Sequence, residues 1–505
     1  MRLDDPFDQT LLEHVRPENW TNPIPSGRYN LVVVGAGTAG LIAASGAAGL
    51  GARVALIERA EMGGDCLNVG CVPSKALLRS AHAAAETRQI QDLGINTEGE
   101  IKADFQSVMS RLRSIRARIA PHDSALRYRD ELGIDVYQGD ARFISSDTVD
   151  VAGTSLQFSK AVIATGARAF VPPITGLDQI DFLTNENVFD LEECPQQLIV
   201  LGGGPIGCEL AQSFQRLGAQ VTLIEATKQF LGREDPDAAD LLHTSLLKDG
   251  IEIRLDTRLI EVRPERGTHH AIVEHEGTRS EVPFDQILVA VGRKPNVANL
   301  GLETVGVEYD EQRGVHVDDF LQTRNRNIYA AGDVCMEHKF THAADFAARA
   351  VIQNALFSVG RIGRRKLSSL TIPWCTYTDP EIAHVGLYER DAVEQGIAVD
   401  TYVRDFGEID RSITESRTHG FVKVHTSQGK DTILGATIVA HSAGDMISEI
   451  SVAMASGMGL GALGNVIHPY PTNAGALAQL GGDYNRTRLT PAVKRMFEKF
   501  LAWRR

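Results

Sequence analysis

The sequence predicts an α/β protein with parallel sheets, and two observations carry that prediction. A buried strand, a glycine-rich turn and a helix follow one another over residues 29–51, and a second strand follows at 53–58. The same order recurs over residues 197–225. A strand–helix–strand order places parallel strands in one sheet. Its recurrence in a chain of 505 residues predicts two such domains.

Each turn carries the glycine spacing of a Rossmann-like nucleotide-binding domain. The first glycine makes the bend, the second lets backbone approach a pyrophosphate, and the third lets the helix pack on the strand. These residues are Gly35, Gly37 and Gly40 in the first domain, and Gly202, Gly204 and Gly207 in the second. The following helix N-terminus offers N–H groups to the phosphates. Close packing alone also uses glycines, but two complete units favour nucleotide binding.

An acidic residue ends the second strand of each domain. Glu58 lies 23 residues after Gly35, and Glu225 lies 23 residues after Gly202. A carboxylate at this place accepts hydrogen bonds from ribose hydroxyls and repels a 2′-phosphate. Glu225 therefore predicts a preference for NADH over NADPH.

Composition and charge argue against several classes of protein. The chain is 43% hydrophobic and 23% charged, which is typical of globular proteins. Its net charge of −14 argues against a nucleic-acid partner. The N-terminus is acidic without an apolar run, so we expect no signal peptide, and we expect no transmembrane segment. With 6 cysteines a disulfide scaffold is not expected, and a cytoplasmic location fits.

The stretch GGDCLNVGCVPSK at residues 63–75 holds two cysteines, Cys66 and Cys71. Two thiols are too few for a structural zinc site, so we expect no structural metal. Residues five apart in an ideal helix have Cα atoms roughly 8–9 Å apart, whereas a disulfide needs about 4.4–6.8 Å. A redox pair here therefore requires a break in the helix, which Gly70 can supply. Cys71 would then begin a helix, a position that favours the thiolate.

The same stretch resembles the redox motif of the class I pyridine nucleotide–disulfide oxidoreductases, such as dihydrolipoyl dehydrogenase and mercuric reductase. The resemblance covers about residues 29–490. It implies FAD in the first Rossmann-like domain, NAD(P)H in the second, and a homodimer. It also implies that Cys66 is the interchange thiol and that Cys71 is the charge-transfer thiolate. Lys75 resembles the lysine near flavin N5, and Glu209 resembles its partner.

Further stretches resemble the family in order along the chain. AVIATGA (161–167) and LVAVGRKPN (288–296) match two short strand-and-turn motifs, and NIYAAGDV (327–334) matches the second flavin motif. TIPWCTYTDPEIAHVGL (371–387) matches the start of a C-terminal α+β dimerisation domain. The cofactor-binding residues implied by these motifs, with the redox motif, are Gly64, Thr165, Gly166, Gly292 and Asp333.

The resemblance also sets domain boundaries. They are an N-terminal extension (1–28), an FAD-binding domain in two parts (29–180 and 299–368), an NAD(P)-binding domain (181–298), a dimerisation domain (369–490) and a basic amphipathic tail (491–505).

The segment HPYPTNAG at 468–475 departs from the dithiol-reducing members of the family. Those members have a His–Glu acid–base dyad, but here Tyr470 stands at the His position and Gly475 at the Glu position. His468 lies two residues early. Loss of a general acid–base typically costs about 10²–10⁴-fold in rate, so efficient lipoamide chemistry is not expected. The tyrosine resembles mercuric reductase, although that enzyme's C-terminal cysteine pair has no counterpart after Cys375.

These features favour an FAD-dependent NAD(P)H oxidoreductase. A hydride would pass from NAD(P)H to FAD, and electrons would pass on to the Cys66–Cys71 disulfide. The acceptor would be a soft metal ion such as Hg(II), or its thiol adduct, with Tyr470 and His468 as further site residues. Three alternatives stay open. They are a lipoamide-like disulfide, direct reduction of a quinone or oxygen by the flavin, and a non-catalytic redox sensor or scaffold.

Two basic stretches have simpler interpretations. RLRSIRARI (111–119) is expected to form a solvated helix face. In the tail, the apolar residues share one helical face among basic residues; they are Val493, Met496, Phe497, Phe500 and Leu501. We expect this face to pack on the protein's own dimer, with a membrane surface or another partner as the alternative.

Overall fold

The computed structural model describes residues 1–505 except residues 3, 97–98, 100–101, 266 and 361. The described residues form two compact units. The first unit holds Met1–Lys228 and Ile251–Leu370, and the second holds Gln229–Gly250 and Thr371–Arg505. The finer domain boundaries given above stay predictions.

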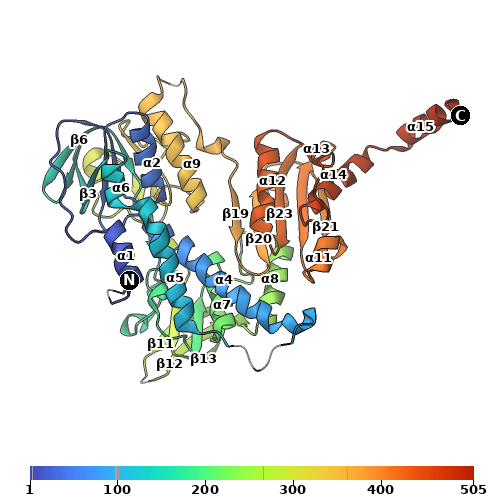
Figure 1. The fold of residues 1–505 in the computed structure, drawn as a ribbon, viewed down its shortest axis with the longest axis horizontal. Coiled ribbons are helices and arrows are strands. Elements are labelled where there is room, and N and C mark those ends of the chain that lie inside the picture. The colour runs from blue at the N-terminus through green and yellow to red at the C-terminus, as the bar shows by residue number, and fades with distance from the viewer. Residues whose placement is uncertain (3, 97–98, 100–101, 266, 361) are drawn as a thin grey trace. The chain divides into compact units, whose positions relative to one another are not determined.

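A mixed sheet in the first unit contains the first glycine turn. Among the described residues its strand order is β3-β2-β1-β6-β5-β4, with β18 also paired to β6. The parallel strands are β1 (Tyr29–Val34), β2 (Val54–Glu58), β3 (Asp135–Gln138), β6 (Thr154–Ile163) and β18 (Ile328–Ala330), and the antiparallel ones are β4 (Ala141–Ser145) and β5 (Thr148–Val151). Helices α2 (Thr38–Gly49) and α9 (Thr341–Ile352) lie side by side (Figure 1).

A second parallel sheet in the first unit contains the second glycine turn. Its order is β10-β9-β8-β14, and α7 (Pro205–Leu217) connects β8 to β9. The strands are β8 (Gln197–Leu201), β9 (Gln220–Ile224), β10 (Glu252–Arg254) and β14 (Gln286–Val289). An antiparallel meander adds β11 (Thr257–Arg263), β12 (His269–His275) and β13 (Thr278–Phe284). The two predicted Rossmann-like domains are therefore confirmed.

The first unit also contains shorter elements around these sheets. Two short strands, β7 (Ala167–Ala169) and β15 (Arg293–Pro295), pair antiparallel and join the two strand-and-turn motifs. The others are α6 (Ala125–Asp130), β16 (Tyr309–Asp310) and β17 (Gly314–Val315).

The N-terminal extension contains a packed helix, α1 (Pro6–Val15), that contacts α5 (Phe105–Ile119). This contact corrects our expectation for residues 111–119. Arg113 and Arg116 of α5 are buried rather than solvated, because Asp5, which caps α1, and Asp8 within α1 pair with them. A buried guanidinium is tolerated when a carboxylate neutralises it.

The second unit is built on a five-stranded antiparallel sheet of order β19-β20-β23-β22-β21. Its strands are β19 (Pro373–Thr376), β20 (Glu381–Gly386), β21 (Val399–Asp405), β22 (Phe421–Ser427) and β23 (Ile433–Ala440). Its helices are α8 (Pro236–Lys248), α10 (Glu389–Glu394), α11 (Asp410–Thr414), α12 (Ala443–Ala455), α13 (Leu460–Leu463), α14 (Gly475–Thr487) and α15 (Pro491–Trp503). Sheet and helices together form the predicted α+β unit.

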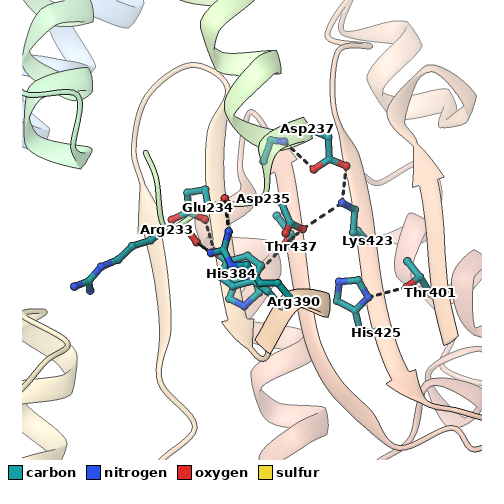
Figure 2. A network of polar contacts seen from close by, with 12 residues as sticks. Arg233, Glu234, Asp235, Asp237, His384, Arg390, Thr401, Lys423, His425 and Thr437 are labelled. Atoms are coloured by element: carbon teal, nitrogen blue, oxygen red, sulfur yellow. Dashed lines mark hydrogen bonds and ion pairs between the residues drawn. The ribbon is translucent and has the colours of Figure 1, made fainter. Parts of the chain in front are cut away.

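A polar network joins the segment before α8 to this sheet, and Figure 2 labels Glu234, Asp235, His384 and Lys423 among its residues. The buried Glu234 carboxylate accepts hydrogen bonds from Trp374 Nε1 at 2.8 Å and from Tyr388 Oη at 2.6 Å. Lys423 Nζ lies 3.2 Å from Asp235 Oδ2. Burial lowers the pKa of His384, in the same region, to about 3, so this imidazole is neutral. The network holds residues from mid-chain on the C-terminal sheet.

The last helix, α15, lies within the region that we expected to be amphipathic. All of its residues are described, and none of them is buried. What covers its apolar face stays a prediction. Within the described part of the chain, no helix has both the length and the apolar character needed to cross a bilayer.

Candidate active site

The two cysteines lie on either side of a break between two helices. Cys66 belongs to α3 (Gly64–Asn68), and Cys71 is the first residue of α4 (Cys71–Arg88). The break falls at Gly70, where a Cβ would lie 2.7 Å from the Asp65 carbonyl oxygen. Both cysteines are thiols in this structure. The irregular segment and the helix beginning at Cys71 are as the sequence predicted.

The thiol pair is electrostatically asymmetric. The pKa of Cys71 is lowered to about 6, first by a hydrogen bond from Cys66 and then by Thr341 and the charge of Lys75, which together outweigh the effect of burial. The same hydrogen bond, together with burial, raises the pKa of Cys66. At neutral pH the pair therefore holds one proton, on Cys66, and a thiolate at Cys71. Thr341, whose Oγ1 lies 3.3 Å from Cys71 Sγ, was missed by sequence reasoning.

Lys75 and Glu209 meet between the two Rossmann-like domains. Lys75 Nζ donates a hydrogen bond to Glu209 Oε2 at 2.8 Å, and the Glu209 side chain is buried. Lys75 lies one turn after Cys71 in α4, and Glu209 lies in the first turns of α7. The structure thus brings together two residues that the family resemblance paired.

Arg293 connects three predicted motifs, and sequence reasoning missed it. Its guanidinium donates to the Asp65 carboxylate and, at 2.7 Å, to the Ala167 carbonyl oxygen. Its Nε also lies 3.5 Å from Asp333 Oδ2. Burial raises the pKa of Asp333, and Arg293 opposes that rise. The sequence offered one signal for it, because Arg293 directly follows Gly292 within one of the motifs that resemble the family.

The two glycine turns are built alike. A Cβ on Gly40 would lie 1.8 Å from the Gly35 carbonyl oxygen, and one on Gly207 would lie 1.9 Å from that of Gly202. Only glycine fits such an approach of helix to strand.

The acid that follows each turn makes the same contact. Glu58 Oε2 accepts from the Ala36 N–H at 2.6 Å, and Glu225 Oε2 accepts from the Gly203 N–H at 2.7 Å. Each acid therefore lies beside its glycine turn, where a ribose would follow the pyrophosphate.

The redox segment lies directly against the first glycine turn. Gly64 has φ +56°, and a Cβ there would lie 2.6 Å from Gly37 Cα. Nearby, Thr165 Oγ1 donates to the Asn296 carbonyl oxygen at 2.7 Å, next to the left-handed Gly166. The bare backbone at Gly37 and Gly64 and the acid at Glu58 fit FAD.

Gly292 and Asp333 complete the set of predicted cofactor-binding residues. Gly292 has φ +131°, and its carbonyl oxygen accepts from the Phe170 N–H at 3.0 Å. This bond continues the pairing of β7 with β15. Asp333 follows β18 and is tied to the redox segment through Arg293, as described above.

Tyr470 and His468 belong to the second unit and have different partners. Tyr470 is 83% exposed, and its hydroxyl donates to Asp410 Oδ2 at 2.7 Å, which raises its pKa. The Nε2 atom of His468 lies 2.8 Å from Glu449 Oε1, and Nδ1 lies 3.1 Å from the Val466 carbonyl oxygen. Both ring nitrogens of His468 are therefore engaged. Asp410 and Glu449 were missed by sequence reasoning, because neither is close in sequence to its partner.

The described residues include no group of three or more His, Cys, Asp or Glu side chains placed to hold a metal ion.

Comparison with protein families decides the class. The pyridine nucleotide-disulphide oxidoreductase model matches residues 29–351, and the dimerisation-domain model of that family matches residues 372–480. The chain belongs to this family. It is thus a flavoprotein disulfide oxidoreductase of class I, with FAD and a pyridine nucleotide as the family's cofactors.

Similar family members include enzymes with different acceptors. A mercuric reductase of Lysinibacillus sphaericus is 33% identical over 455 residues, which is 90% of this chain and 82% of the relative. A dihydrolipoyl dehydrogenase of Staphylococcus aureus is 32% identical over 449 residues, 87% of this chain and 93% of the relative.

A solved structure of a flavoprotein disulfide reductase has the same fold. The HOCl-induced flavoprotein disulfide reductase RclA from Escherichia coli superposes with a TM-score of 0.79 at 29% identity, over 90% of this chain and 99% of that chain. Its Cu(II) complex superposes with a TM-score of 0.80.

Proposed function

We propose that this protein is an NAD(P)H-dependent oxidoreductase that uses Cys66 and Cys71 to reduce a soft metal ion, Hg(II) or a similar ion, or its thiol adduct. The observation that carries the proposal is the thiol–thiolate pair at Cys66 and Cys71, combined with a tyrosine where dithiol reducers have their acid–base histidine. Thiolates bind soft ions strongly, and such binding needs no general acid. The mercuric reductases among the relatives support this acceptor class.

The site residues and FAD would have separate roles in electron transfer. FAD held at the first glycine turn would carry electron pairs from the nicotinamide to the sulfur atoms. Two electrons and one proton convert the Cys66–Cys71 disulfide to the Cys66 thiol and the Cys71 thiolate. The Lys75 ammonium, held by Glu209, would stabilise negative charge that develops beside it.

The metal step is balanced by one further equivalent of NAD(P)H. Hg(II) would displace the proton of Cys66 and bind between the two sulfur atoms. Two electrons from NAD(P)H then reduce the ion to Hg(0), which leaves and releases both thiolates. Cys66 takes up a proton again.

The assembly and the nucleotide preference belong to the same proposal. The dimerisation-domain match supports a homodimer, in which Tyr470 of one protomer would face the thiol pair of its partner. The carboxylate of Glu225, held beside the second glycine turn by Gly203 and Thr227, supports NADH over NADPH. A cytoplasmic location would keep the pair reduced between turnovers.

The test is anaerobic NADH oxidation by the purified flavoprotein. Hg(II) as a thiol adduct, Cu(II), lipoamide and a quinone are offered in separate reactions. Copper is included because the RclA structure exists as a Cu(II) complex. We expect turnover with the metal adduct that Cys66→Ala abolishes, while quinone reduction survives in that variant. Turnover with lipoamide alone, or metal turnover that persists in Cys66→Ala, would contradict the proposal.

A further inference from the structure

We infer that the N-terminal helix α1 positions the redox thiol pair, through a buried chain of contacts that runs from Asp8 through Arg116 to Asn68. The inference rests on the proposed redox use of Cys66 and Cys71. The family model matches from residue 29 onward, so α1 lies outside the matched region. The family model therefore does not describe this helix.

The contacts form one continuous path. Arg116 Nη2 donates to Asp8 Oδ1 at 2.8 Å, and both side chains are 0% exposed. Arg116 Nη1 donates to the Asn68 carbonyl oxygen at 2.8 Å. Asn68 lies between the two cysteines, at the last position of α3. Because a guanidinium is planar, fixing one of its amino groups on Asp8 fixes the direction of the other.

A second tie holds the beginning of the redox segment. The Val15 carbonyl oxygen, at the end of α1, accepts from the Met62 N–H at 3.0 Å. The Asn68 side chain donates to the carbonyl oxygens of Met62 and Gly64, at 3.0 and 2.9 Å. Helix α1 thus holds the chain just before Cys66 and, through Arg116, just after it.

Position matters here because the backbone between the cysteines sets how their sulfur atoms meet. The chain leaves α3 at Asn68 and enters α4 at Cys71. Disulfide geometry is narrow, so a small shift of Asn68 changes the stability of the disulfide relative to the dithiol. The same shift changes the hydrogen bond from Cys66 that favours the Cys71 thiolate.

The test measures the thiol–disulfide equilibrium of the full-length FAD-bound protein, without any acceptor. Protein is equilibrated in buffers of reduced and oxidised dithiothreitol, quenched with acid and alkylated. Mass spectrometry of the peptide that contains both cysteines then gives the ratio of dithiol to disulfide. We expect Asp8→Leu and Arg116→Met to change the equilibrium constant by about threefold or more. Asp8→Asn keeps an acceptor oxygen for Arg116 and the shape of the side chain, so it should fold normally and shift the constant less.

Arg113→Met is the matched control. Arg113 is also buried in α5, and its Nη1 lies 3.6 Å from a carboxylate oxygen of Asp5, which caps α1, but it donates to the Leu191 carbonyl oxygen instead of the redox segment. We expect this variant to lower thermal stability as Arg116→Met does, without moving the equilibrium. Equal shifts in the two variants, or no shift in Asp8→Leu and Arg116→Met, would overturn the inference. Loss of acceptor reduction in the wild type would instead overturn the proposed function, because this equilibrium is measured without an acceptor.

Discussion

Lys75 and Glu209, 134 residues apart in sequence, form an ion pair of 2.8 Å between α4 and α7. Helix α4 begins at the reactive Cys71, and α7 begins at the second glycine turn. The pair therefore joins the thiol site to the domain of the second glycine turn through two helices that also pack on one another.

Removal of the Lys75 ammonium should slow the transfer of electrons from NADH to the flavin. Lys75→Met leaves the buried Glu209 without its cation, so negative charge beside the site is no longer stabilised. Loss of one such electrostatic group typically costs about 10²–10³-fold, and we expect a fall of this order in the rate of flavin reduction by NADH. Anaerobic stopped-flow absorbance measures it. Lys75→Arg, which keeps the charge, should retain most of the rate, and an unchanged rate in Lys75→Met would exclude the role.

The reactivity of Cys71 should follow the pKa lowered to about 6. Its thiolate is favoured in the folded protein, so the associated stabilisation is complete above the ordinary thiol pKa of 9.0 and is lost as pH falls through about 6. In the folded, reduced protein, the rate of Cys71 alkylation should therefore rise with pH, with a midpoint near the lowered pKa.

Two variants at Cys66 test whether its hydrogen bond lowers the pKa of Cys71. Cys66→Ala removes the principal hydrogen-bond donor, so the Cys71 midpoint should move upward. Cys66→Ser retains a hydroxyl donor and should move it less. Mass spectrometry of iodoacetamide-treated peptides across pH measures both variants, and identical midpoints in the two would contradict the hydrogen-bond explanation.

Tyr470 should matter for the metal acceptor. Its hydroxyl, held by Asp410, has a raised pKa and stays protonated at neutral pH. Tyr470→Phe should lower kcat/KM for the Hg(II) thiol adduct by about tenfold or more. Asp410→Asn keeps an acceptor for the hydroxyl and should have a smaller effect. Full activity in Tyr470→Phe would remove this residue from the proposed site.

Glu58 and Glu225, the two carboxylates expected to contact a ribose, allow a paired test of which domain binds which cofactor. Glu225→Ala removes the charge that opposes a 2′-phosphate, and we expect the NADH-to-NADPH ratio of kcat/KM to fall by about tenfold. Glu58→Ala should instead weaken retention of FAD and leave that ratio unchanged. Steady-state kinetics and flavin content after gel filtration measure the two effects. A changed ratio in Glu58→Ala alone would reverse the assignment of the two domains.

Local patterns were sufficient to predict the two Rossmann-like domains and the helix that begins at Cys71. Strand, glycine turn and acid lie close together in sequence, so their spacing reports their geometry directly. Arg116 was misjudged because its partner, Asp8, lies 108 residues away. A charged side chain on a helix is expected to be exposed to solvent unless a carboxylate elsewhere in the chain neutralises it. The contacts of Thr341 with Cys71 and of Glu449 with His468 were missed for the same reason.

The network around Glu234 makes the C-terminal unit a poor module for exchange between relatives. A fragment beginning at Thr371 would carry Trp374, Tyr388 and Lys423 but would leave behind the carboxylates of Glu234 and Asp235 that these side chains contact. A chimera cut at the apparent junction would thus separate donors from acceptors inside one folded body. Transplanting this unit requires residues 229–250 of the same parent, so recombination that respects the fold must exchange two segments at once.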